Sequence, residues 1–353
     1  MADIDYTFLG FYDLPTFNTR FSEKFSKNPR FNGGAFSDMD TLVDMIGRDL
    51  NISDVRWGAY MLATVMWETT SLFTFEVPVK NNKGQPLMKK GKPVTVKQKK
   101  WLMTMAPVDE VGHGKGRRYH EPVKVAVLAD GSARVTEQDG DQFSISTAGA
   151  IKALTKGAKM GTTDGGAAVK VYNDDPGDEN AYFGRGYVQL TWWSNYAKAG
   201  VAIGRGLDLL LDPELVKEPK IAYAIMAHGM RTGFGFANGH KFSEFFSGKN
   251  RDYKHARKMV NGMSHAEDVA KLAKVFEQIL LDSRMWVRIP PQYPMRSKGI
   301  EAYGDHDHRR LPKPRAGAID GAVDEYVGPD GGASRECALR LAGQSDAGQC
   351  VSL

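Results

Sequence analysis

The sequence predicts a mainly α-helical fold that carries a β-rich insertion and an extended C-terminal tail. Two stretches near the N-terminus and one at Ala266–Arg284 place apolar residues at helical spacing. Between them, residues 77–145 change to short β-prone runs separated by Lys-Gly turns. After residue 286, proline- and glycine-rich sequence replaces the helical pattern, which is typical of a linker.

The N-terminal elements follow in order. Residues 1–36 show no clear period and are expected to form an irregular lead-in. Ser37 is the expected N-cap of a first helix, and Asp54 that of a second. The second helix places Glu68 on its apolar side, where a carboxylate is costly unless it is paired, hydrogen-bonded or functional. The apolar face of the first helix consists of Met39, Leu42, Val43, Ile46 and Leu50.

Later segments complete the expected domain. Residues 161–180 are expected to be a polar loop, and Asp212-Pro213 has the N-cap and first-turn pattern of a helix start. The helical domain is therefore predicted to cover residues 37–286, followed by a linker over 287–336 and a tail over 337–353.

The composition excludes several classes of protein. The apolar fraction of 42% suffices for a globular core, and no stretch reaches the roughly 18 apolar residues of a membrane span. The only cysteines, Cys337 and Cys350, lie near the end, which excludes a disulfide framework in the main body. The net charge of +5 is mild and no basic stripe alternates with aromatics, so no nucleic-acid partner is expected.

Two segments carry candidate chemistry. Glycoside hydrolysis usually needs two carboxyl groups, and Glu68 is followed eight residues later by Glu76. The second segment, residues 180–196, has a Gly-Arg-Gly turn ahead of aromatic and amide side chains that suit sugar rings. Its candidate substrate-binding residues are Tyr182, Arg185, Gln189, Trp192 and Asn195.

Together these segments resemble glycoside hydrolase family 19, the chitinases and the related phage-type endolysins. The resemblance rests on WETT at 67–70, on YFGRGYVQLTWWSNY at 182–196, and on the late Asn261-Gly262. It implies a lysozyme-like α+β helical domain in which Glu68 is the general acid and Thr191 positions the attacking water. It further implies that Gln189, Asn195 and Asn261 bind sugar or shape the cleft, and that Arg185 braces its floor.

The identity of the second carboxylate stays open. Glu76 matches the second glutamate of the endolysin branch, which follows the first at a similar short distance. Asp109, Glu110 and Glu121, in the inserted region, are the alternatives. Trp67 stands where the family usually has histidine.

The resemblance favours peptidoglycan as the substrate, cleaved at its β-1,4 glycosidic bonds without a cofactor or a metal ion. A chitinase and an inactive glycan-binding module are the alternatives. Because the N-terminus lacks a secretory signal, the protein is expected to be made in the cytoplasm. It would then act on the cell wall, in the periplasm, after lysis-type release or delivery by a secretion or phage machine. A secreted effector would also imply an immunity protein as partner.

The extreme C-terminus carries a separate resemblance. Gly348-Gln349-Cys350-Val351 is similar to the nucleophile segment of papain-like cell-wall amidases. This similarity implies that residues 337–353 begin a truncated second domain with Cys350 as its nucleophile.

Overall fold

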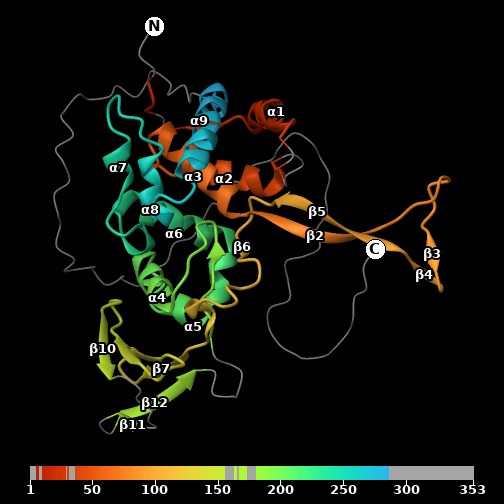
Figure 1. Cartoon of the computed structure of the whole chain (residues 1–353). Helices are drawn as coiled ribbons and strands as arrows, with labels where there is room; N and C mark the ends of the chain where they lie inside the picture. The colour runs from red at the N-terminus through yellow and green to blue at the C-terminus, as the bar shows by residue number, and fades with distance from the viewer. Residues whose placement is uncertain are drawn as a thin grey trace, which may run out of the picture. The chain divides into compact units, whose positions relative to one another are not determined.

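The computed structural model describes residues 5–7, 10–28, 30–31, 36–155, 163–164, 167–172 and 180–285. The expected linker, the tail and Cys350 lie outside these residues. The described part is a mixed α+β fold, in which helices and small antiparallel sheets both contribute, rather than a mainly α fold (Figure 1). None of the helices in these ranges combines the length and apolar character needed to cross a bilayer.

The secondary structure follows this order. The α-helices are α1 (Leu14–Phe25), α2 (Phe36–Arg48), α3 (Val55–Glu68), α4 (Trp193–Ala202), α5 (Asp208–Leu211), α6 (Pro219–Thr232), α7 (Phe242–Phe245), α8 (Lys258–Asn261) and α9 (Ala266–Asp282). Short 3-10 turns are η1 (Arg118–His120), η2 (Pro213–Lys217), η3 (Gly235–Ala237) and η4 (His255–Arg257). The strands are β1 (Phe11–Tyr12), β2 (Thr70–Pro78), β3 (Met88–Lys89), β4 (Lys92–Pro93), β5 (Thr95–Met103), β6 (Val108–Asp109), β7 (Lys124–Leu128), β8 (Ala133–Thr136), β9 (Gln142–Ile145), β10 (Ile151–Thr155), β11 (Thr163–Asp164), β12 (Ala167–Tyr172), β13 (Arg185–Gly186) and β14 (Arg284–Met285).

Helix α3 is the central helix of the core. Asp54 caps it as predicted, since its side chain accepts a hydrogen bond from the backbone N–H of Arg56. Residues 55 and 56 and 58–66 are all buried, as expected for a helix surrounded by others. A Cβ on Gly58 would lie 2.9 Å from Ile46 of α2 and 3.4 Å from Leu280 of α9, so the three helices approach closely here (Figure 1). Glu68 is the last residue of this buried helix.

The N-terminal segment is more ordered than the sequence suggested. Residues 14–25 form α1, with the Asp13 side chain accepting a hydrogen bond from the N–H of Thr16. Phe17, Phe21 and Phe25 lie one helical turn apart, and their ring centroids are 5.8–6.4 Å from that of Phe276 in α9. An aromatic stripe with a capped start therefore makes this segment part of the core.

The predicted apolar faces of α2 and α9 are largely confirmed. Met39, Leu42, Val43 and Ile46 are buried, whereas Leu50 lies beyond the end of α2 and is 77% exposed. Helix α2 begins at Phe36, one residue before its expected cap. Helix α9 buries the apolar residues at helical spacing in the predicted segment Ala266–Arg284, which are Val269, Leu272, Phe276, Ile279 and Leu280. The expected start at Asp212-Pro213 opens η2, and α6 follows it at Pro219.

Beyond Glu68 the chain enters a two-stranded ribbon. Strands β2 and β5 pair antiparallel over their whole length, from Thr70 opposite Met103 to Pro78 opposite Thr95. The short strands β3 and β4 lie at the far end of the ribbon, which leads away from the helices (Figure 1).

A second, larger sheet follows the ribbon. Its strand order is β10-β9-β8-β7-β12-β11, and it packs against the start of α4, where the rings of Phe143 and Trp193 are 5.1 Å apart. Strand β12 lies within residues 161–180, which were expected to be a loop, and pairs antiparallel with β7. The strands therefore continue past residue 145, the expected end of the β-prone region.

Candidate functional site

A cleft of about 520 Å³ opens at the C-terminal end of α3. It brings together Glu68, Gln189, Thr191 and Asn261, which the sequence analysis selected from distant segments. It also includes Glu110, one of the alternatives for the second carboxylate. The full lining is Glu68, Ser71, Glu110, Val111, Arg117, Tyr119, Gly184, Val188, Gln189, Thr191, Val260 and Asn261.

The carboxylate of Glu68 forms an ion pair with Arg257. Its Oε1 atom lies 2.7 Å from Nη2 of Arg257, whose side chain is only 1% exposed. Arg257 comes from η4, and its Nε donates to the carbonyl of Ser264 at 2.9 Å, which fixes the guanidinium. Burial raises the pKa of the nearby Tyr60, so its phenol stays neutral beside this ion pair. Arg257 was not predicted from the sequence, although it stands only four residues before Asn261.

Glu110 is the second acidic residue of the cleft, and its carboxylate is fixed by two donors. The backbone N–H of Gly184 donates to Oε2 at 3.1 Å, and the Tyr119 hydroxyl donates to Oε1 at 3.1 Å. Its own backbone N–H donates to the carbonyl of Gly184 at 2.7 Å. Burial, and then the negative charge of Glu110, raise the pKa of Tyr119, so this phenol keeps the proton that it donates.

The Gly-Arg-Gly turn anchors the segment that carries Glu110. Strand β13 pairs with β6, with Arg185 opposite Asp109 and Gly186 opposite Val108. The side-chain amide of Gln189 donates to the carbonyls of Val108 and Gly186, at 3.1 and 3.2 Å. Gln189 therefore lines the cleft and also joins the two short strands.

The side chain of Arg185 is buried and does not line the cleft. Its side chain is 5% exposed, and its Nε lies 3.1 Å from Glu214 and 3.4 Å from Asp109. Its Nη1 donates to the hydroxyl of Tyr196 at 3.2 Å, and the guanidinium sits 3.6 Å from the ring centre of Phe183. These contacts fix the Arg185 side chain within the protein, as a role in bracing the cleft floor requires. They also place Asp109 in an ion pair with Arg185, and Asp109 does not line the cleft.

Gly186 has a conformation and a setting that favour glycine. Its φ is +79°, and a Cβ there would lie 2.9 Å from the backbone oxygen of Val216. We expect Gly186→Ala to lower the free energy of unfolding by about 1–3 kcal/mol, measured by urea denaturation. Gly204→Ala is the matched control, since φ there is +77° with nothing within 4 Å of the added Cβ. Equal losses in both variants would show that the contact with Val216 contributes nothing.

Glu76 does not reach the cleft. It lies on β2, where side chains alternate between the two faces of the ribbon. Ser71 lines the cleft, and Glu76, five residues later, falls on the other face, opposite Lys97. There it is exposed and accepts a hydrogen bond from the Thr95 hydroxyl at 3.3 Å. The strand register therefore places Glu76 away from the cleft, in contrast to the prediction that Glu76 is the second carboxylate beside Glu68.

The other predicted residues lie around the cleft. Tyr182 is buried, and its hydroxyl donates to the carbonyl of Leu210. It therefore packs within the protein and does not line the cleft. The amide of Asn195 donates to the carbonyl of Thr191 at 2.9 Å, close to the cleft wall. Trp192 is 40% exposed, with a φ of +72°, and borders a small separate pocket that Glu121 also lines.

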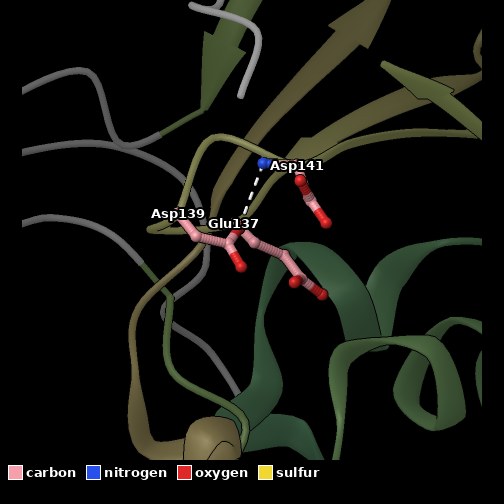
Figure 2. A group of neighbouring side chains, drawn as sticks. All are labelled: Glu137, Asp139 and Asp141. Carbon is pink, nitrogen blue, oxygen red and sulfur yellow. Dashed lines mark hydrogen bonds between the residues drawn. The ribbon is translucent and has the colours of Figure 1, made fainter. Parts of the chain in front are cut away.

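In the described ranges, three carboxylates come close enough together to hold a metal ion. Glu137, Asp139 and Asp141 lie on the turn between β8 and β9 (Figure 2). Arg118 already pairs with Glu137 at 2.9 Å and with Asp139 at 3.0 Å. The other oxygen of Glu137 accepts from the indole of Trp193 at 2.9 Å. The cluster thus joins the larger sheet to α4, and it contributes no residue to the cleft.

Comparison with known proteins locates the similarity in one segment. Residues 155–230 match the family model of glycoside hydrolase family 19, described as chitinase class I. A stretch of 70 residues is 46% identical to the acidic endochitinase pcht28 of Solanum chilense and 41% identical to the acidic 26 kDa endochitinase of Solanum lycopersicum. No solved structure matches the chain significantly.

The similarity covers a limited part of each protein. The aligned stretch is 20% of this chain and 26% of each relative, so the match spans about a quarter of the length of the relatives. The matched residues 155–230 include the Gly-Arg-Gly turn, α4, α5 and most of α6, while Glu68 and Glu110 lie outside them. Through this segment the chain is similar to glycoside hydrolase family 19.

Proposed function

We propose that this protein is a glycoside hydrolase that cleaves β-1,4 bonds between N-acetylhexosamines, with Glu68 as general acid and Glu110 as the second carboxylate. The observation that carries the proposal is the cleft itself, which is lined by both glutamates together with Thr191 and Asn261. Glycoside hydrolysis requires such a pair of carboxyl groups on a shared cleft. The match of residues 155–230 to the glycoside hydrolase family 19 model supports the same reaction class.

The chemistry divides between the two glutamates. Glu68 gives its proton to the glycosidic oxygen as the bond to the anomeric carbon breaks. Glu110 accepts a proton from the attacking water, whose oxygen forms the new bond to that carbon, and Thr191 orients the water. Tyr119 and Gly184 hold the Glu110 carboxylate in place, as Arg257 holds Glu68.

Peptidoglycan is the substrate that we favour. Its strands carry carboxylates, and the chain has a net charge of +5, which attracts an anionic polymer over long range. Chitin, which has the same β-1,4 linkage without these carboxylates, is the second candidate. It is favoured by the similarity of residues 155–230 to the chitinase class I family and by the two Solanum relatives named endochitinases.

Product analysis tests the proposal. Purified protein and its Glu68→Gln form are incubated separately with peptidoglycan sacculi and with chitin oligomers, and the released products are identified by mass spectrometry. Muropeptides released by the native protein alone support the peptidoglycan proposal. Digestion of chitin alone assigns the second candidate. Binding to sacculi without release of fragments by either form contradicts a hydrolase and favours a glycan-binding module.

A further inference from the structure

The ribbon of β2 and β5 has two different faces. Residues directly opposite each other in an antiparallel pair share a face, and successive residues alternate between faces. One face, here called the platform, is largely apolar. It consists of Ser71, Phe73, Phe75 and Val77 on β2 and Val96, Gln98, Lys100 and Leu102 on β5.

The opposite face is fixed to the helical body at its near end. It includes Trp101, which lies opposite Leu72. The guanidinium of Arg30 lies 4.4 Å from the ring centre of Trp101 and 4.0 Å from that of Trp67 in α3. This stacked arginine joins the near end of the ribbon to the C-terminal end of α3.

The platform is continuous with the cleft. Ser71, its first residue, lines the cleft together with Glu68, three residues earlier in the chain. Phe73 and Phe75 follow on the same face, with ring centroids 6.3 Å apart. Phe75 is 42% exposed, and Val96 and Leu102 on the partner strand are 45% and 40% exposed. A row of accessible apolar side chains thus leads outward from the candidate active site.

The ribbon is also strongly cationic. Residues 70–103 contain eight lysines and one acidic residue, Glu76, so the segment has a formal charge of +7. This exceeds the +5 of the whole chain, and so the remaining residues sum to −2. The positive charge is therefore concentrated in this ribbon, whose first residues border the cleft, and it attracts an anionic polymer to the ribbon.

We propose that the platform is an extended binding surface for an anionic glycan strand that continues out of the cleft. Phe73 and Phe75 stack on sugar rings, and Lys100, directly opposite Phe73, pairs with a carboxylate carried by the strand. This inference rests on the proposed function and deepens it, because a neutral chitin strand uses the aromatic rings but gives Lys100 no partner. The ribbon thereby selects the charged polymer.

Binding to insoluble polymers tests the platform without depending on turnover. The parent is the full chain carrying Glu68→Gln, so that the polymer is not consumed. Its co-sedimentation with peptidoglycan sacculi and with chitin is compared with that of Phe73→Ala/Phe75→Ala and of Lys100→Gln. Thr74→Ala/Lys99→Gln, on the opposite face, is the matched control. Circular dichroism and thermal unfolding verify that each variant is folded.

The expected pattern differs between the variants. Loss of the two rings weakens binding to sacculi about tenfold, or 1.4 kcal/mol, and weakens binding to chitin as well. Loss of Lys100 weakens binding to sacculi in a salt-dependent way and leaves chitin binding unchanged. The control pair binds both polymers like the parent.

Three outcomes would overturn the inference. The first is parent-like binding of the ring variant to sacculi, and the second is an equal loss in the control pair. The third is parent-like binding of Lys100→Gln to sacculi at low salt, which would leave the anionic groups of the strand without a partner on the platform. Failure of the proposed function is separate, since it shows as an absence of released fragments from the native protein whatever the binding results.

Discussion

Glu68→Gln and Glu110→Gln are each expected to slow glycan cleavage by about 10²- to 10⁴-fold, the usual contribution of a positioned acid or base. Glutamine preserves the shape of each side chain but can neither donate the proton to the leaving oxygen nor accept one from water. Both residues line the cleft, and both are held by fixed neighbours. The rate is measured as reducing ends released from soluble oligosaccharides.

The matched control for both substitutions is Glu76→Gln. Glu76 is exposed on the ribbon face that does not border the cleft, so its replacement is expected to leave the rate unchanged. Full activity of Glu110→Gln together with loss of activity in Glu76→Gln would show that Glu76, the residue favoured by the sequence, is the second carboxylate. Full activity of both would point to a carboxylate elsewhere.

Arg257→Met is expected to lower the free energy of unfolding by about 3–5 kcal/mol, the usual result of removing one partner of a buried ion pair. Methionine fills similar volume but leaves Glu68 without its cation. The arginine is 1% exposed and the glutamate 14%, so water replaces little of the lost interaction. Urea denaturation, followed by circular dichroism, gives the difference in the transition midpoint.

A double variant separates the ion pair from simple packing. In the Glu68→Gln background the charge that Arg257 balances is gone, so adding Arg257→Met is expected to cost less than it does alone. An additive result would mean that Arg257 stabilises the fold through its contact with the Ser264 carbonyl and its packing. The coupling energy is obtained from the four unfolding curves.

The sequence predicts the helical core well because the core depends on local patterns. The capping by Asp54 and the buried faces of α2 and α9 follow from spacing within one helix. Helix α1 was missed, although Phe17, Phe21 and Phe25 have helical spacing, because the flanking residues show no matching period. Its burial depends on Phe276, which is more than 250 residues away along the chain.

The second carboxylate of the site could not be chosen from the sequence. Whether Glu76 faces the cleft depends on the parity of a strand whose register is set by its partner, and a shift of one residue would reverse it. Glu110 reaches the cleft because β6 pairs with β13, which lies more than 70 residues later. The motif residues Tyr182 and Arg185 were expected at the substrate, but their polar atoms bond to the protein itself. Sequence patterns identify the motif, and they do not show which of its side chains point inward.

The pairing of β2 with β5 keeps Glu68 and Glu110 in place when the chain between them changes in length. The two glutamates are separated by 42 positions, yet Thr70 and Met103 are direct neighbours, because the antiparallel hairpin brings the end of β5 back beside the start of β2. Adding or removing one residue pair at the far end alters the reach of the ribbon and leaves its base where it is. The reaction centre and the outer binding surface can therefore diversify independently, and a pair of carboxylates that act together need have no fixed spacing along the chain.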